Sequence, residues 1–440
     1  MIYKLIALLV SATGFFLSAW IILPAPIFSL LPLAIGAPEV SPWLWVVNIL
    51  GGVLAFQLFR SSSRDVIKGN IKRARRNLQL AYLTIGFSSL GLLLSLLPII
   101  QFPAINQVAQ TEIEQLYDPK LKRSLGSNYL ANIPSSQRVM MRPQPFVLWD
   151  AWWGIPSLPV RYDRGISLGK TIDNPPENAP ENPQKESLTL DIYRPPQKGT
   201  YPAIVILHGG AWQGGSPGDN AEFSRYMAAR GYVVWAITYR SAPKYKFPAQ
   251  IDDVQTALRF IQQHGLEYET DVNRVALMGR SAGAHLAMLA AYDTPKPNTL
   301  PIRAVVDYYG PVDLTAGYYD VPNPDPINSR AILLDFLGGT PDQLGNLYKT
   351  ASPITYVDIA KQQKHPLPPS LLIYGGKDHI VMAKFGKALG QNLLSSGGQA
   401  IFLEIPWADH SFDAVFSGVS NQLALYYTER FLAHVLTKFN

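Results

Sequence analysis

The stretch VALMGRSAGAHLAMLA, from Val275 to Ala290, decides how the second half of this chain folds. Its apolar start is typical of a buried strand, and its small and apolar end is typical of a helix. Between them lies Gly279-Arg280-Ser281-Ala282-Gly283, whose small residues allow a sharp turn from strand to helix. Chance often supplies a lone Gly-x-Ser-x-Gly, so either Ser281 is reactive or the small residues only let a helix pack tightly.

Apolar strand candidates alternate with helical patterns on both sides of this stretch. The strands are predicted at 203–207, 232–238, 274–278, 304–308, 370–374 and 400–405. Helical patterns are predicted at 219–230, 249–264, 281–292, 383–394 and 421–438. Such alternation predicts an α/β fold, with a mostly parallel, doubly wound sheet covered on both faces. PVRYDRGISLG and SLTLDIYRP are predicted to form a hairpin across the polar, proline-rich loop 171–186.

The composition excludes several classes of site. The chain has 440 residues and no cysteine, which removes disulfides, thiolate zinc sites and a cysteine nucleophile. The net charge of +6 comes largely from seven basic residues between Arg60 and Arg76, so a nucleic-acid-binding surface is not indicated. We expect no metal and no cofactor.

Three uncharged apolar runs, at about 5–23, 43–59 and 78–100, occupy the first hundred residues. A helix needs about 20 such residues to cross a bilayer, so residues 1–104 are predicted to be a transmembrane module. Buried core helices of a large soluble domain are the alternative, and a cleaved signal peptide is an alternative for the first run.

Charge predicts the orientation of this integral membrane protein. Segment 60–77 is rich in Lys and Arg, and short loops of this kind stay in the cytoplasm. The N-terminus is then expected on the cytoplasmic side as well. The proline-rich loop 24–42 has no basic residue, and Trp43 and Trp45 at its end fit an interfacial aromatic belt. The remainder of the chain is therefore expected on the extracytoplasmic side. The basic loop is also suited to anionic lipid, which is compatible with this topology.

Residues 105–158 are predicted to connect the module to a domain at 159–440. The connection contains a candidate short amphipathic helix at 105–121. It also contains Trp149, Trp152 and Trp153, which we interpret as a packing or interfacial cluster rather than a substrate contact. The long gap 310–369 between two strands is predicted to cover the site as a cap.

Ser281 lies at the carboxyl end of a predicted strand, where ligand sites of parallel sheets gather. A serine hydroxyl needs a base to become a nucleophile, and the base needs an orienting acid. His410 follows the strand at 400–405, and Asp378 follows the strand at 370–374. His379 is the rival base and Asp409 the rival acid, although a residue adjacent to the base rarely turns onto its imidazole.

The stretch VILHGGAWQGG follows the strand at 203–207 and contains His208, Gly209, Gly210 and Trp212. Glycines let backbone N–H groups approach a ligand closely. With the N–H of Ala282, Gly209 and Gly210 are therefore candidates for an oxyanion hole, and a plain glycine turn is the alternative. Further candidate substrate contacts follow: His208, Trp212 and Trp407.

Residues 159–440 resemble the α/β-hydrolase superfamily, in its esterase and lipase group with an HGG oxyanion motif. The matching stretches are DIYRP, HGGAW, YRSAPKYKFPAQIDD, GRSAG, YYGPVDL, GGKD and HSFD. The resemblance implies Ser281 as nucleophile, Asp378 as acid and His410 as base, with the three oxyanion donors named above. HGGAW in place of HGGG favours the isoprenylcysteine methylesterase, kynurenine formamidase and feruloyl-esterase-like branch. Ser411 stands where many members have glycine.

These observations predict a membrane-anchored serine hydrolase that cleaves a carboxylic ester through an acyl-enzyme. A lipid-borne ester is one candidate substrate. A peptidase or amidase on the same fold is one alternative. A membrane-tethered binding protein that retains a hydrolase fold without catalysis is the other. The acyl chain length, the leaving group and the oligomeric state are not predicted.

Overall fold

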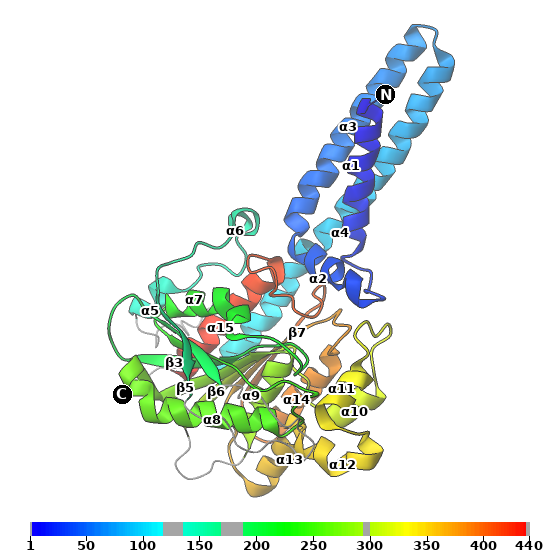
Figure 1. The fold of residues 1–440 in the computed structure, drawn as a ribbon. Helices are drawn as coiled ribbons and strands as arrows, with labels where there is room; N and C mark the ends of the chain where they lie inside the picture. Colours follow the sequence, from blue (N-terminus) through cyan, green and yellow to red (C-terminus); the bar gives the residue numbers. More distant parts are fainter. Residues whose placement is uncertain (1, 118–134, 169–187, 294–299, 437–440) are drawn as a thin grey trace.

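The computed structural model describes residues 2–117, 135–168, 188–293 and 300–436 (Figure 1). Three long helices form a stalk that projects from a domain of sheet and helices. The stalk consists of α1 (Ile2–Ala19), α3 (Ser41–Ile67) and α4 (Ile71–Tyr117). The loop predicted at 171–186 lies outside the described residues.

Eight strands form one sheet in the order β1-β2-β4-β3-β5-β6-β7-β8. β1 and β2 pair antiparallel, as the predicted hairpin requires, and β2 pairs antiparallel with β4. All other pairs are parallel, which confirms the predicted α/β fold. The strands are β1 (Arg161–Ser167), β2 (Thr189–Arg194), β3 (Tyr201–Leu207), β4 (Val233–Ile237), β5 (Thr270–Arg280), β6 (Ile302–Tyr308), β7 (Ser370–Gly375) and β8 (Ala400–Ile405).

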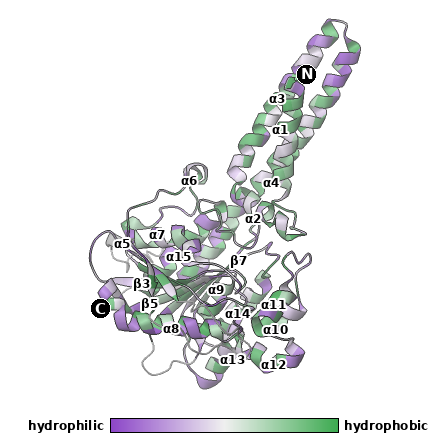
Figure 2. Cartoon of the chain, in the orientation of Figure 1, coloured by the Kyte–Doolittle hydropathy of each residue, from purple (hydrophilic) through white to green (hydrophobic). Residues whose placement is uncertain are grey.

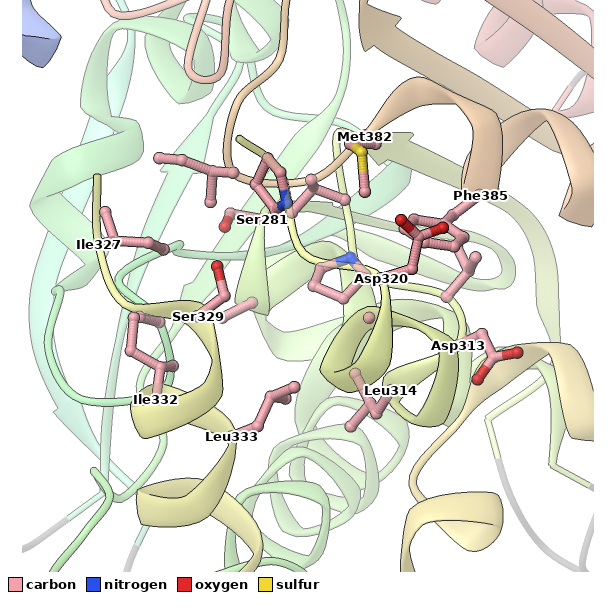
Figure 3. Close-up of a pocket in the computed structure, with 18 of the residues that line it drawn as sticks. Ser281, Asp313, Leu314, Asp320, Ile327, Ser329, Ile332, Leu333, Met382 and Phe385 are labelled. Atoms are coloured by element: carbon pink, nitrogen blue, oxygen red, sulfur yellow. The ribbon is translucent and has the colours of Figure 1, made fainter. Parts of the chain in front are cut away.

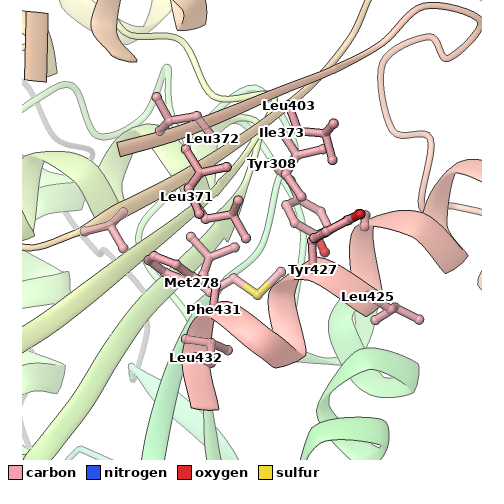
Figure 4. Packing of buried hydrophobic residues seen from close by; sticks show 14 of the residues in the cluster. Met278, Tyr308, Leu371, Leu372, Ile373, Leu403, Leu425, Tyr427, Phe431 and Leu432 are labelled. Atoms are coloured by element: carbon pink, nitrogen blue, oxygen red, sulfur yellow. The ribbon is translucent and has the colours of Figure 1, made fainter. Parts of the chain in front are cut away.

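Successive side chains of each strand point to opposite faces of the sheet, so the core has two layers, one on each face. On β3, Ile204 faces a cluster that includes α7 (Ala221–Ala228) and α15 (Val419–Val435). Val205 faces a cluster that includes α8 (Ala249–His264) and α9 (Ala282–Tyr292). Figure 4 shows Phe431 of α15 on the sheet beside Met278. Each such fully buried side chain contributes about 1.5–3 kcal/mol, so helices are held on both faces.

Further helices complete the domain. Within the predicted cap region 310–369 lie α10 (Leu314–Tyr319), α11 (Ser329–Leu337), α12 (Pro341–Thr350) and α13 (Pro353–Gln363). The remaining elements are α5 (Ser135–Met140), α6 (Leu148–Trp153), η3 (Pro217–Asn220), η4 (Gly265–Tyr268) and α14 (Ala383–Ser395). α10 and α11 lie near the carboxyl ends of the parallel strands, so they are placed to cover a site there (Figure 1).

The three stalk helices are each long and apolar enough to cross a membrane, which suggests membrane association. Figure 2 shows a mostly hydrophobic stalk with a hydrophilic tip, where α3 and α4 join. Polar side chains are buried between the helices: Ser88 Oγ donates to Ser11 Oγ at 2.9 Å, and Asn48 Nδ2 donates to Ser18 Oγ at 3.0 Å. Large apolar side chains such as Phe56 are exposed instead.

Two predictions about the connections were correct only in part. The short helix expected at 105–121 is helical as far as Tyr117, but it is the end of α4, which continues through Pro98 and Pro103; 118–121 lie outside the described residues. Its Phe102, Ala109 and Ile113 belong to the core of the domain that contains the sheet, because their spacing places them on one helical face. The expected loop at 24–42 contains η1 (Phe28–Leu30) and α2 (Leu31–Glu39), since a proline in the first helical turn costs no hydrogen bond.

Candidate active site

Ser281 occupies a strained turn between β5 and α9. Its φ of 50° and ψ of −122° are rare for a residue with a side chain. The flanking glycines are required: a Cβ on Gly283 would lie 2.3 Å from the carbonyl oxygens of Leu207 and His208. A Cβ on Gly279 would lie 2.3 Å from the backbone of Gly283. Tight packing and exposure of the Ser281 hydroxyl are therefore two results of the same turn.

The structure brings Ser281, His410 and Asp378 into one hydrogen-bonded chain. His410 Nδ1 lies 2.8 Å from Asp378 Oδ2, and His410 Nε2 lies 3.0 Å from Ser281 Oγ. The other carboxyl oxygen of Asp378 accepts the backbone N–H groups of Ile380 at 2.8 Å and Val381 at 2.7 Å. With Nδ1–H directed at the carboxylate, Nε2 is free to accept the serine proton.

Three further residues hold the His410 loop, and the sequence analysis did not find them. Arg280 forms a salt bridge with Asp413, and the Tyr309 hydroxyl donates a hydrogen bond to the same carboxylate. The Tyr309 ring lies 4.6 Å from the His410 ring. Arg280 stands directly before Ser281, so the pair with Asp413 ties the serine turn to the histidine loop. Only the position of Arg280 inside the motif hinted at this role.

The rival residues lie elsewhere. His379 Nδ1 is 3.4 Å from Asp409 Oδ2, and Asp409 Oδ1 accepts the backbone N–H of His410 at 2.8 Å. This carboxylate therefore braces the backbone of the loop. His285 is fully buried, with Nε2 2.7 Å from the Ala351 carbonyl oxygen. Burial lowers the pKa of His285 to about 4, so it is a neutral link between α9 and the cap.

The glycine loop after β3 approaches Ser281 closely. A Cβ on Gly209 would lie 3.5 Å from the Ser281 Cβ, and Gly210 has a φ of 116°. The next residue, Ala211, lines the cavity together with Ser281 and Ala282. Ala211 was not among the predicted oxyanion residues, although its place directly after two glycines was a usable signal.

The three predicted substrate contacts separate in the structure. Trp212 lines the cavity and stacks on Phe336 at 4.2 Å between ring centres. His208 does not line it; the ring is buried against Tyr239, and Nδ1 lies 2.8 Å from the Gly209 carbonyl oxygen. Trp407 does not line it either, because its Nε1 donates to Ser420 Oγ at 2.9 Å within the core.

The cavity beside Ser281 is lined mainly by apolar side chains from the cap and from the loop after β7 (Figure 3). Leu314, Ile327 and Leu333 come from the cap, and Met382 and Phe385 come from the segment after Asp378. Such a lining suits an apolar group bound next to the serine. Across the described ranges, no group of acidic or histidine side chains is arranged to hold a metal ion.

The base of the stalk contacts the loops that carry the acid and the base. Lys377, next to Asp378, donates to the carbonyl oxygens of Trp20 at 3.1 Å and Ile21 at 2.8 Å. Glu39 accepts the backbone N–H of Ser420 at 2.8 Å, at the start of the helix that follows the His410 loop. Burial raises the pKa of Glu39 to about 8 and lowers that of Lys377 to about 8.

A mostly parallel sheet, a serine turn after a central strand, a carboxylate after β7 and a histidine after β8 together define an α/β-hydrolase. The comparisons with known proteins agree with this class. The family model BD-FAE matches residues 190–393. The chain thus has the α/β-hydrolase fold, as its motifs predicted.

The relatives from Mycobacterium tuberculosis include LipM and LipC. The probable carboxylic ester hydrolase LipM is 30% identical over 263 residues, which cover 56% of this chain and 58% of LipM. The esterase LipC is 32% identical over 243 residues, 51% of this chain and 57% of LipC. The chain therefore spans less than two thirds of either relative. A solved bacterial heroin esterase has a TM-score of 0.53 at 20% identity, covering 64% of this chain and 85% of that one, and is similar in fold.

Proposed function

We propose that this protein is a membrane-anchored serine hydrolase that cleaves a carboxylic ester through an acyl-enzyme. The observation that carries the proposal is the chain of contacts from Asp378 through His410 to Ser281, at 2.8 and 3.0 Å. The names of the relatives LipM and LipC, an ester hydrolase and an esterase, support an ester as the substrate class.

In the first half-reaction, Ser281 Oγ attacks the ester carbonyl carbon while His410 Nε2 takes the hydroxyl proton. The Asp378 carboxylate keeps the imidazole oriented and stabilises its positive charge. The backbone N–H groups of Gly209, Gly210 and Ala282, with Ala211 as an added donor, stabilise the oxyanion. Loss of one such donor typically costs about 10²–10³-fold in rate.

Collapse of this intermediate breaks the bond to the alcohol oxygen, which leaves with the proton held by His410. The acyl group then remains on Ser281 Oγ, inside the apolar cavity. In the second half-reaction, His410 takes a proton from water, and the resulting attack releases the carboxylic acid and restores the serine. The chemistry uses only groups of this chain, water and the ester.

The same proposal places the stalk in a membrane. The basic segment 60–77 lies at the tip of the stalk, far from the hydrolase domain (Figure 1). If this segment stays in the cytoplasm with the N-terminus, the hydrolase domain lies on the extracytoplasmic side. An impermeant thiol reagent should then label a Leu266→Cys variant on intact cells, since the parent has no cysteine.

The decisive test compares the parent with Ser281→Ala and with Ser395→Ala, a control at an exposed serine on α14. On p-nitrophenyl butyrate we expect Ser281→Ala to lose about 10³–10⁶-fold in kcat, with the control unchanged. A fluorophosphonate probe should label the parent and the control only. Equal rates for parent and Ser281→Ala exclude the mechanism, and no labelling of either favours the non-catalytic binding protein. Faster cleavage of a matched anilide favours an amidase.

A further inference from the structure

One apolar cluster at the base of the stalk contacts the active-site cavity. The stalk-base cluster consists of buried Trp20, Ile21, Ala25, Leu31, Ala34, Ala37 and Leu44. Two side chains that pack against it, Ile327 and Ile380, also line the cavity that contains Ser281. Ile327 belongs to the cap, and Ile380 lies two residues after Asp378. The same pair of side chains therefore separates the stalk from the cavity.

The outer side of this segment is apolar and exposed. Ile22, Leu23 and Ile27 are each about half exposed, and Phe28 is 70% exposed. The sequence carries no charged residue between Lys4 and Glu39. An exposed apolar group of this size needs a partner, because isolated apolar side chains are common on protein surfaces but contiguous ones are not.

A second apolar group lies on the other side of the stalk base in Figure 1, at α6. Trp149 and Trp153 are 66% and 65% exposed, and their ring centres are 5.7 Å apart. The ring centre of Trp153 also lies 6.1 Å from that of Trp43, the third residue of α3. Tryptophan is enriched where a membrane meets water, since its ring is apolar and its N–H is polar.

We propose that Ile22, Leu23, Ile27, Phe28, Trp149 and Trp153 form a membrane-facing rim that seats the hydrolase domain on the bilayer, so that the ester is lipid-borne. Its acyl chain leaves the bilayer beside the 20–30 segment and enters the cavity past Ile327 and Ile380. This inference rests on the proposed function, and it adds the substrate class and its route.

We take the bilayer to be the partner of the rim, because the rim adjoins α1 and α3, which are apolar and long enough to cross a bilayer. α1 ends at Ala19, three residues before the first exposed side chain of the rim, and Trp43 stands at the start of α3. Lys377 and Glu39 fix the 20–40 segment to the domain, so the rim and the cavity keep one relative position. A cavity held at the membrane surface receives an apolar chain without passage through water.

The test uses the full chain in phosphatidylcholine vesicles and two esters. One is a long-chain fluorogenic ester embedded in the vesicles, and the other is water-soluble p-nitrophenyl acetate. For the Ile27→Asp/Phe28→Asp variant we expect at least a 10-fold lower rate on the embedded ester and a rate within 2-fold of the parent on the soluble one. Leu266→Asp is the matched control, because Leu266 on η4 is 71% exposed. Equal losses on both esters, or no loss on either, overturn the inference.

A second measurement separates this inference from the proposed function. Because the parent has no cysteine, Phe28→Cys, Trp153→Cys and Leu266→Cys can each carry one fluorophore. A lipid-attached quencher should quench the first two and leave the third bright. If the protein stays with the membrane in carbonate and reacts with fluorophosphonate, yet the Phe28→Cys probe is not quenched, only the membrane-facing rim fails. If the protein is extracted or does not react, the proposed function fails.

Discussion

The stalk and the hydrolase domain bury opposite kinds of side chain. In the domain, Val205, Leu277 and Leu372 are fully buried. In the stalk, Ser11 and Ser88 are among the most buried residues, while many large apolar side chains, such as Leu9 and Phe56, face outward. Burial of apolar groups stabilises a fold in water, whereas helices in lipid gain more from close packing and hydrogen bonds between polar groups. This difference supports the proposal that one chain folds against two solvents.

Both regions nevertheless use glycine for close packing, and the neighbours differ. A Cβ on Gly283 would meet the backbone of Leu207 and His208 at 2.3 Å. A Cβ on Gly91 in the stalk would meet the end of the Asn48 side chain at 2.2 Å, and its nearest backbone neighbour is the Cα of Phe15 at 3.0 Å. A backbone within a sheet cannot give way, but a side chain can rotate. The same substitution, glycine to alanine, should therefore have a larger effect at Gly283 than at Gly91.

The largest effect is expected for Gly283→Ala. The added methyl group must push the turn away from β3, which displaces both Ser281 Oγ and the Ala282 N–H. Loss of nucleophile and oxyanion donor together should lower kcat/KM on a soluble ester by about 1,000-fold or more. Gly91→Ala is the stalk counterpart and should stay within about 3-fold. Similar losses for both variants contradict the difference we draw between the two interiors.

The next largest effect is expected when a charge is placed on the outer surface of the stalk rather than on that of the hydrolase domain. Leu90 lies near the middle of the longest apolar run and is 47% exposed. Leu90→Asp should weaken membrane integration by about 3 kcal/mol, because aspartate at the centre of a membrane helix is strongly disfavoured relative to leucine. Leu266→Asp, at a more exposed position of the hydrolase domain, should be silent. The measurement is the fraction of protein retained in membranes after carbonate treatment; equal retention means that the stalk is not in lipid.

The sequence predicted the fold because apolar strands alternate with helical patterns, and this signal is local. It also placed Ser281, Asp378 and His410 correctly at strand ends, and the structure then brings the three together. Contacts between distant segments leave no such local signal. The pairing of Arg280 with Asp413 and the position of Ile327 beside the stalk depend on tertiary structure.

The continuation of α4 into the domain was missed for a related reason. Pro98 and Pro103 are signals for a helix end in water, and the apolar positions Phe102, Ala109 and Ile113 are too widely spaced to stand out. Tertiary packing overrides both signals, since the Tyr427 hydroxyl donates to the Asn106 carbonyl oxygen at 2.8 Å on the same helix. The joint between the two regions is therefore a continuous helix that contributes Phe102, Ala109 and Ile113 to the core of the domain.

The smallest effect is expected at the contact between the stalk and the hydrolase domain, where Glu39 of the stalk base is buried. Burial raises its pKa from 4.5 to about 8. Between these two values the folded protein holds a proton that the unfolded chain has lost, so stability falls as pH rises through this window. From pH 6 to 8 the parent should lose about 2 kcal/mol relative to Glu39→Gln, whose amide oxygen can still accept the Ser420 N–H.

Thermal unfolding in detergent at the two pH values measures this difference. Burial lowers the pKa of Lys377 to about 8, so its contribution to stability rises above that pH, opposite in sign to that of Glu39. Burial likewise raises the pKa of Asp307 to about 7, but that carboxyl is present in parent and variant alike and cancels. Parallel pH curves for the two proteins mean that the Glu39 carboxyl reaches water. The joint between the stalk and the hydrolase domain is then looser than the contacts of Glu39 and Lys377 indicate.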